Sequence, residues 1–141
     1  MSADRFLDSN VLIYQLDTRD RRKHRVADRL VGDAIAGQSA CISFQVVQEC
    51  LNTVVRKAEV RLDATQATAW LDTVLTPLMA VTPSHGLYRE ALQVRERWQL
   101  SFYDALIVAA ALEAGCTTLL TEDLQHGQRF GDLEVVDPFR V

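Results

Sequence analysis

Short apolar runs alternate along the chain with longer stretches in which apolar residues recur every three or four positions. The short runs predict β-strands, and the longer stretches predict helices. The expected strands are residues 6–7, 40–42, 79–81, 117–120 and 134–136, and the expected helices are residues 11–16, 24–36, 44–57, 63–75, 84–98 and 103–114. This alternation predicts an α/β fold, in which a mostly parallel sheet carries helices on both faces.

Several helix boundaries are marked by residues with known capping preferences. Ser43 is suited to cap the helix that follows it, and Gly37 is suited to end the helix before it. Pro77 is expected to end the helix 63–75, because the residue before a proline disfavours helical backbone. Residues 103–114 are almost wholly apolar, so this helix is expected at the centre of the core.

The composition fits one globular domain spanning residues 1–141, with 48% hydrophobic and 24% charged residues. No apolar run approaches the ~20 residues of a membrane span. The N-terminal sequence MSADRFLDSN lacks the apolar core of a signal peptide, so we expect a cytoplasmic protein. The three cysteines, Cys41, Cys50 and Cys116, lie in apolar stretches, which predicts buried free thiols.

Four acidic residues, Asp8, Glu49, Asp104 and Asp123, are placed where strands or helices would deliver them to one end of the sheet. Sites in open parallel sheets lie beyond the carboxyl ends of the strands. Carboxylates that gather there repel one another unless a cation intervenes. Ligation by oxygen alone favours Mg²⁺ or Mn²⁺ over zinc. The sequence therefore predicts a metal-dependent enzyme.

Each carboxylate also has a purely structural interpretation. Asp8 is suited to cap the first helix, Asp104 could complete a capping box with Ser101, and Asp123 is typical of a turn. Glu49 lies opposite the apolar face of its helix, so a solvated polar face is the favoured interpretation when this residue is taken alone. That apolar face comprises Val46, Val47, Cys50, Leu51, Val54 and Val55, and the polar face comprises Gln45, Gln48, Glu49, Asn52 and Arg56.

The charge distribution allows a phosphodiester substrate. The four candidate carboxylates alone account for the net charge of −4. Basic residues cluster between Arg19 and Arg25, interrupted by Asp20, and a basic rim beside a metal-filled acidic cleft suits a polyanion. A solvated helix start explains the same cluster.

Four segments together resemble the PIN-domain nucleases and, more narrowly, the VapC-type toxins of bacterial toxin–antitoxin pairs. These segments are FLDSNVLIY, FQVVQECLNTVVRK around Glu49, SFYDALIVAAAL and LLTEDLQHGQ, and the closing VVDPF also fits. The resemblance covers nearly the whole chain. It implies a three-layer α/β/α fold, a homodimer, endonucleolytic cleavage of RNA, and silencing by a cognate antitoxin whose tail occupies the cleft.

The resemblance also implies roles for individual residues. Asp8, Glu49, Asp104 and Asp123 correspond to the family's acidic quartet, with Asp8 and Asp104 as the pair most expected to hold Mg²⁺ (or Mn²⁺). Thr121 matches a hydroxyl that orients the site, and Ser9 and Asn10 match polar residues that support the first aspartate. Glu122 lies beside Asp123, but the family pattern Thr-x-Asp favours Asp123 as the fourth carboxylate.

Two other classes of function are considered. In a non-catalytic module, the acidic cleft would only bind a basic partner, and RNA would be sequestered without cleavage. In a receiver-like domain, an aspartate at a strand end would accept a phosphoryl group. The receiver is disfavoured because the first strand ends in a single acidic residue and no suitably placed lysine follows a late strand.

Overall fold

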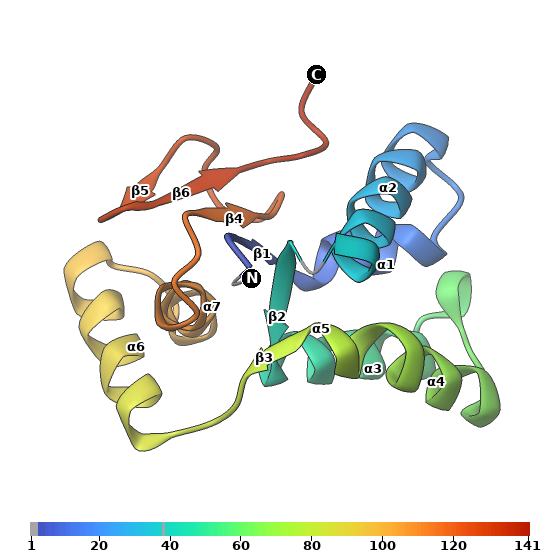
Figure 1. The fold of residues 1–141 in the computed structure, drawn as a ribbon, viewed down its shortest axis with the longest axis horizontal. Coiled ribbons are helices and arrows are strands. Elements are labelled where there is room, and N and C mark those ends of the chain that lie inside the picture. Colours follow the sequence, from blue (N-terminus) through green and yellow to red (C-terminus); the bar gives the residue numbers. More distant parts are fainter. Residues whose placement is uncertain (1–2, 38) are drawn as a thin grey trace.

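The computed structural model describes residues 3–37 and 39–141. Met1 and Ser2, which begin the segment considered above as a possible signal peptide, lie outside these ranges. The described chain contains a six-stranded sheet in the order β3-β2-β1-β4-β6-β5 (Figure 1). Its strands are β1 (Arg5–Leu7), β2 (Ala40–Ser43), β3 (Met79–Val81), β4 (Thr118–Leu120), β5 (Arg129–Phe130) and β6 (Leu133–Val136). All neighbouring strands are parallel except β5 and β6.

Helices cover both faces of this sheet, which confirms the predicted α/β/α fold. Figure 1 shows α6 and α7 on one side and α1 and α2 on the other. The helices are α1 (Ser9–Leu16), α2 (Arg21–Gly37), α3 (Phe44–Arg56), α4 (Ala64–Trp70), α5 (Thr76–Leu78), α6 (His85–Trp98) and α7 (Phe102–Glu113), with a 3₁₀ turn η1 (Ala58–Val60) and a π-helical turn η2 (Leu71–Leu75).

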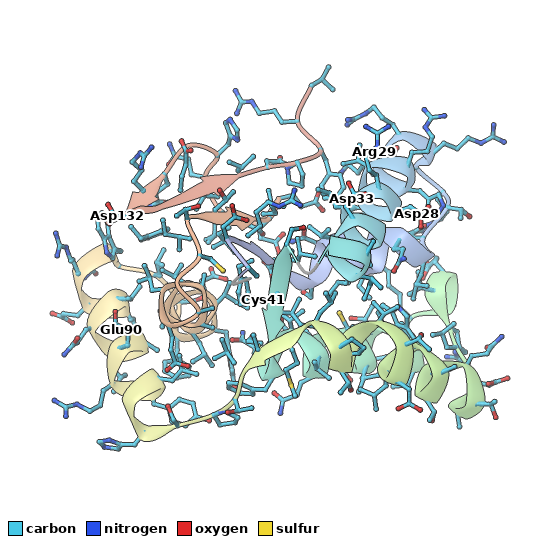
Figure 2. The ribbon with its side chains drawn as sticks, in the orientation of Figure 1. Asp28, Arg29, Asp33, Cys41, Glu90 and Asp132 are labelled. Carbon is cyan, nitrogen blue, oxygen red and sulfur yellow. The ribbon has the colours of Figure 1, made fainter. Side chains whose placement is uncertain are left out.

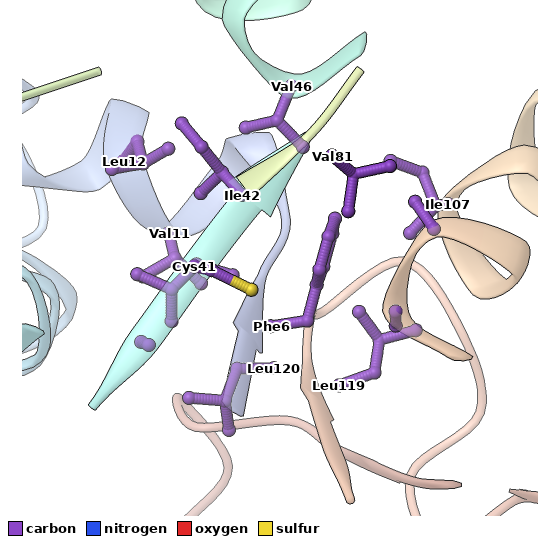
Figure 3. Packing of buried hydrophobic residues seen from close by; sticks show 14 of the residues in the cluster. Phe6, Val11, Leu12, Cys41, Ile42, Val46, Val81, Ile107, Leu119 and Leu120 are labelled. Carbon is purple, nitrogen blue, oxygen red and sulfur yellow. The ribbon is translucent and has the colours of Figure 1, made fainter. Parts of the chain in front are cut away.

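The core is built around the central strands β1, β2 and β4. Figure 3 shows Val11 and Leu12 of α1 on one side of these strands and Ile107 of α7 on the other. Phe6 and Leu119 are completely buried between the layers. Full burial of side chains of this size contributes about 1.5–3 kcal/mol each, so the central strands are held firmly in register.

The central position of β1 in the sheet leaves room for a ligand beyond the carboxyl end of this strand. The chain leaves β1 for β2 on one side, and it later enters β4 on the other side. The register pairs Leu7 with Leu120, so the parallel strands β1 and β4 end side by side. Such a reversal of strand order leaves a crevice beyond the strand ends, where ligands bind. Asp8 and Thr121 are the first residues past those ends.

The helical segment around Pro77 differs from the expectation. It continues through Pro77 to Leu78 and does not end before the proline. The reason is the π turn Leu71–Leu75, after which a new α-helical turn begins at Thr76. Pro77 therefore lies near the start of a turn, where its missing N–H needs no helical acceptor.

Three further details depart from the sequence pattern. Strand β5 was not predicted, because two residues are too few to show a period. Val55 was placed on the apolar face of α3 but is 57% exposed, because no element covers its side of the helix, although the adjacent Val54 is completely buried. Gln45 was placed on the solvated face but is only 4% exposed.

The thiols and the charged residues are distributed as expected of a folded core and its surface. Cys41, Cys50 and Cys116 are buried free thiols, and the sulfur atoms of Cys41 and Cys116 lie 3.6 Å apart. Figure 2 shows Cys41 inside the molecule, whereas the labelled charged side chains, such as Arg29 and Glu90, lie at its periphery. No helix among residues 3–37 and 39–141 combines the length and the hydropathy needed to span a bilayer.

Candidate active site

Asp8 lies at the junction between β1 and α1. Its backbone N–H donates to the carbonyl of Leu120 at 3.0 Å, which fixes it beside the end of β4. Its side chain caps α1 by accepting from the Ser9 N–H at 2.7 Å. Its other carboxylate oxygen accepts from the Thr121 hydroxyl at 2.7 Å. The capping interpretation of Asp8 is therefore confirmed, and the same carboxylate also contacts the residue that follows β4.

Thr121 is the centre of a hydrogen-bond network that joins the two strand ends. It is fully buried and donates its single hydroxyl proton to Asp8. Its oxygen accepts from the Asn10 amide at 3.1 Å and from the Asp123 N–H at 3.0 Å. Asn10 also donates to the carboxylate of Asp123 at 3.1 Å. The two acidic residues that follow β1 and β4 are thus linked through shared polar partners.

Glu49 reaches the same end of the sheet from α3. Ser43 at the end of β2 caps this helix, as predicted, by accepting from the Val46 N–H at 3.4 Å. Glu49 follows one turn later and is half-buried. The sulfur of Cys50 lies 4.0 Å from the carbonyl oxygen of Ser9, so this turn of α3 packs against the start of α1. The polar face of α3 is thus solvated at Gln48 and Asn52, which are exposed, and only partly solvated at Glu49.

Asp104 lies in the first turn of α7. The hydroxyl of Ser101 caps the helix by accepting from the Asp104 N–H at 3.3 Å. The reciprocal bond of a capping box, from the Ser101 N–H to the Asp104 carboxylate, does not occur in the described structure, so that the predicted box is only half formed. The half-buried carboxylate of Asp104 is therefore available for other contacts.

The electrostatics show that these carboxylates share one environment. Burial raises the pKa of Asp8 from 3.8 to about 6, against the hydrogen bonds from Thr121 and Ser9, and the charges of Glu49 and Asp123 raise it further. Burial likewise raises the pKa of Glu49, and the charges of Asp123 and Asp104 add to the shift. Like charges in partly desolvated positions make the metal-free site costly to ionise.

Glu122 has a different environment from its neighbour Asp123. Its carboxylate lies 2.9 Å from the ammonium of Lys23 and accepts from the Tyr14 hydroxyl at 2.8 Å. Lys23 also lies over the Tyr14 ring, 4.9 Å from its centroid. Glu122 is therefore paired with a cation of this chain, whereas Asp123 faces Asn10 and the other acids. This geometry separates the two candidates for the fourth carboxylate.

A cleft of about 510 Å³ is lined by Ser9 and Asn10, which follow Asp8 in the chain, but by none of the four candidate carboxylates. Its charged lining residues are Asp17, Arg19, Asp20, Lys57 and Glu122. Of the predicted basic cluster, Arg19 pairs with Asp17, Lys23 pairs with Glu122, and Arg22 donates to the carbonyl of Phe139. Much of that cluster is thus engaged in the fold, and it is less free than the sequence suggested.

The four candidate carboxylates offer oxygen ligands, which divalent cations such as Mg²⁺ prefer. Among residues 3–37 and 39–141, no three histidine, cysteine or acidic side chains converge closely enough to form a ready-made cation cage. Mg²⁺ retains several waters and commonly contacts one or two carboxylates directly. A buried carboxylate with like-charged neighbours, as at Asp8, fits an ion of that kind.

Gln45 was missed as a candidate by the sequence analysis. It lies one turn before Glu49 on α3 and donates from its amide nitrogen to Glu49 at 3.4 Å and to the Tyr103 carbonyl at 3.1 Å. The signal that could have found it is the i, i+4 spacing from Glu49, which places both side chains on one helix face.

Comparisons with known proteins agree on one fold. The family model for the PIN domain matches residues 5–129. Among curated proteins, no sequence matches the chain significantly. Three solved structures are similar at 14–21% identity, a level that shows the fold alone.

The first of these is a toxin–antitoxin complex from Klebsiella pneumoniae, with a TM-score of 0.66, 18% identity, and coverage of 97% of this chain and 99% of that one. The second is VapC20 of Mycobacterium tuberculosis, described as a sarcin–ricin loop cleaving toxin, with a TM-score of 0.60, 21% identity, and coverage of 84% and 91%. The third is VapBC2 from Rickettsia felis bound to a promoter DNA fragment, with a TM-score of 0.64, 14% identity, and coverage of 93% and 96%.

Proposed function

The chain belongs to the PIN-domain family, and on this premise we propose that it is a divalent-cation-dependent endoribonuclease, the toxin of a toxin–antitoxin pair. The single observation that carries the proposal is the environment of Asp8. This carboxylate is 6% exposed, feels the charges of Glu49 and Asp123, and forms no ion pair with any described residue. A buried charge without a partner is strongly destabilising unless a ligand compensates it.

In this proposal Asp8, Asp104, Glu49 and Asp123 hold Mg²⁺ or Mn²⁺, one or two of them directly and the others through water molecules that the cation retains. When bound, the cation supplies charge that stabilises the developing negative charge on the phosphodiester and lowers the pKa of water. Thr121 and Ser9 fix the Asp8 carboxylate by donating to its two oxygens. Asn10 fixes the Asp123 carboxylate, which accepts a hydrogen bond from the water and orients it toward phosphorus.

The substrate and partners in this proposal follow from the family and the cleft. Lys57 lies on the wall of the cleft beside Asn10 and supplies a cation for binding of a polyanion such as RNA, whereas Arg19 on the same wall is paired with Asp17. A cognate antitoxin would cover the same cleft with a basic segment. Tyr88 and Leu92 leave exposed apolar surface one turn apart on α6, which supports a homodimer. We place this single nuclease domain, residues 1–141, in the cytoplasm.

The test is RNA cleavage by purified, antitoxin-free protein. A panel of structured RNAs is incubated with Mg²⁺, with Mn²⁺ or with EDTA, and Asp8→Asn is assayed beside the wild type. We expect cleavage that requires the cation and that falls by more than about 100-fold in Asp8→Asn, which exceeds the usual cost of altering an outer-shell partner. Cleavage by Asp8→Asn at the wild-type rate would overturn the assignment. Binding of RNA without cleavage across the panel would favour the non-catalytic module.

A further inference from the structure

Gln45 joins the two helices that carry Glu49 and Asp104. Its amide nitrogen donates to the Glu49 carboxylate within α3, and it donates to the carbonyl of Tyr103, the residue before Asp104 in α7. Both neighbours of this nitrogen are obligate acceptors, so the orientation of the amide is fixed by chemistry. One side chain therefore holds Glu49 at a set position relative to the first turn of α7.

The other half of the same amide is unusual. Gln45 is 4% exposed, and its oxygen has no hydrogen-bond partner among the described residues. A buried acceptor without a partner costs about 1–3 kcal/mol, so such groups are uncommon in folded proteins. A protein that only needed to fill this space would be more stable with an apolar residue of similar volume. The polar side chain is therefore explained by the two contacts of its nitrogen and not by packing.

We infer that Gln45 is a positioning residue of the carboxylate site, whose nitrogen fixes the Glu49 carboxylate relative to the first turn of α7. This inference rests on the proposed function. Residues that orient a ligating carboxylate without touching the cation commonly set metal affinity. Gln45 fills that role for Glu49, because its nitrogen joins the Glu49 carboxylate to the backbone of α7.

Replacement of Gln45 should lower the affinity for the cation without lowering the stability of the metal-free protein. In Gln45→Met the volume is kept, and both the donor to Glu49 and the unpaired acceptor are removed. We expect the affinity of the metal-free protein for Mn²⁺ to fall about tenfold. We expect the unfolding temperature without metal to stay the same or rise, because the buried unpaired oxygen is gone. A residue that only supports the fold would lower both quantities together.

The experiment is a calorimetric titration of metal-free protein with Mn²⁺, without RNA, combined with thermal unfolding of each protein. Gln48→Met is the matched control, because Gln48 is exposed on the same helix. Gln45→Leu is the second variant and provides the same comparison if the methionine does not fold. Wild-type affinity in the folded Gln45 variants would overturn the inference, as would a parallel loss of affinity and stability. If the wild type itself binds no Mn²⁺, the proposed function fails, and this inference fails with it.

Discussion

Two aspartates at opposite ends of α1 have almost the same exposure and opposite acidities. Asp8 caps the start of the helix and is 6% exposed, and Asp17 caps its end and is 5% exposed. The pKa of Asp8 is raised to about 6 by burial, whereas hydrogen bonds from Arg19 lower the pKa of Asp17 to about 2. The helix dipole alone predicts the reverse order, because it favours a negative charge at the helix start.

The two pKa values differ because the two carboxylates lie at different depths in the protein and have different charged neighbours. Asp17 lies near the surface and accepts three hydrogen bonds from Arg19, at 2.8–3.1 Å. Asp8 lies deep in the protein, and Glu49 and Asp123, which are also acidic, add to its cost of ionisation. Arg19 thus neutralises the carboxylate of Asp17, whereas no cation of the described chain neutralises the carboxylate of Asp8. Such uncompensated groups concentrate at functional sites.

Substitutions at Asp123 and at its neighbour Glu122 should give clearly different cleavage rates. Asp123→Asn removes a carboxylate of the proposed site, so cleavage should fall by about 10- to 100-fold. Glu122→Gln only weakens the pair with Lys23, so cleavage should stay within about threefold. Rates measured side by side on one RNA decide between the two residues. The opposite order would make Glu122 the fourth carboxylate.

Asparagine substitutions should affect the stability of the two capping aspartates in opposite directions. Asp8→Asn removes a desolvated charge and keeps an acceptor for Ser9, so it should stabilise the metal-free protein by about 2 kcal/mol near neutral pH. Asp17→Asn removes the charge that Arg19 pairs with, so it should destabilise the protein by about 1 kcal/mol and leave cleavage unchanged. Urea denaturation of both variants checks these signs, and a shared sign would refute the contrast.

The pH dependence of stability should show the raised pKa of Asp8. Between about pH 6 and pH 4 the native protein binds a proton that the unfolded chain does not bind. The free energy of unfolding of the metal-free protein should therefore increase as the pH falls through this window, by up to about 1.4 kcal/mol per pH unit. Asp17 acts in the opposite direction at lower pH, between about 4 and 2. Denaturation at several pH values should show a smaller slope in Asp8→Asn.

Most of the fold and the positions of the four acids could be predicted from the sequence, because they depend on local patterns. Apolar periodicity located the main strands and helices, and the capping preference of Ser43 located the start of α3. The rule for strand ends then placed Asp8 and Asp123 at one edge. No single acidic residue predicted a site by itself. The prediction came from their expected position at one edge of the sheet and from their match to the family motif.

The parts that could not be predicted depend on tertiary packing. Helical periodicity predicts the side of α3 on which a residue lies, but it does not predict which helix or strand packs on that side. Gln45 is buried because α7 approaches this face of the helix, and Val55 is exposed because no element covers it. The pairing of Glu122 with Lys23 joins residues that are 99 positions apart, so no local pattern shows it.

The most direct test of the uncompensated carboxylate site is thermal unfolding of the wild type and Asp8→Asn with and without Mn²⁺. Without metal, Asp8→Asn should unfold at the higher temperature, because it lacks the buried charge. Saturating Mn²⁺ should raise the wild-type transition by mass action and leave Asp8→Asn nearly unchanged, which would reverse the order. If Asp8→Asn is the less stable protein in both conditions and Mn²⁺ shifts neither, Asp8 is a structural cap and the cation site is refuted.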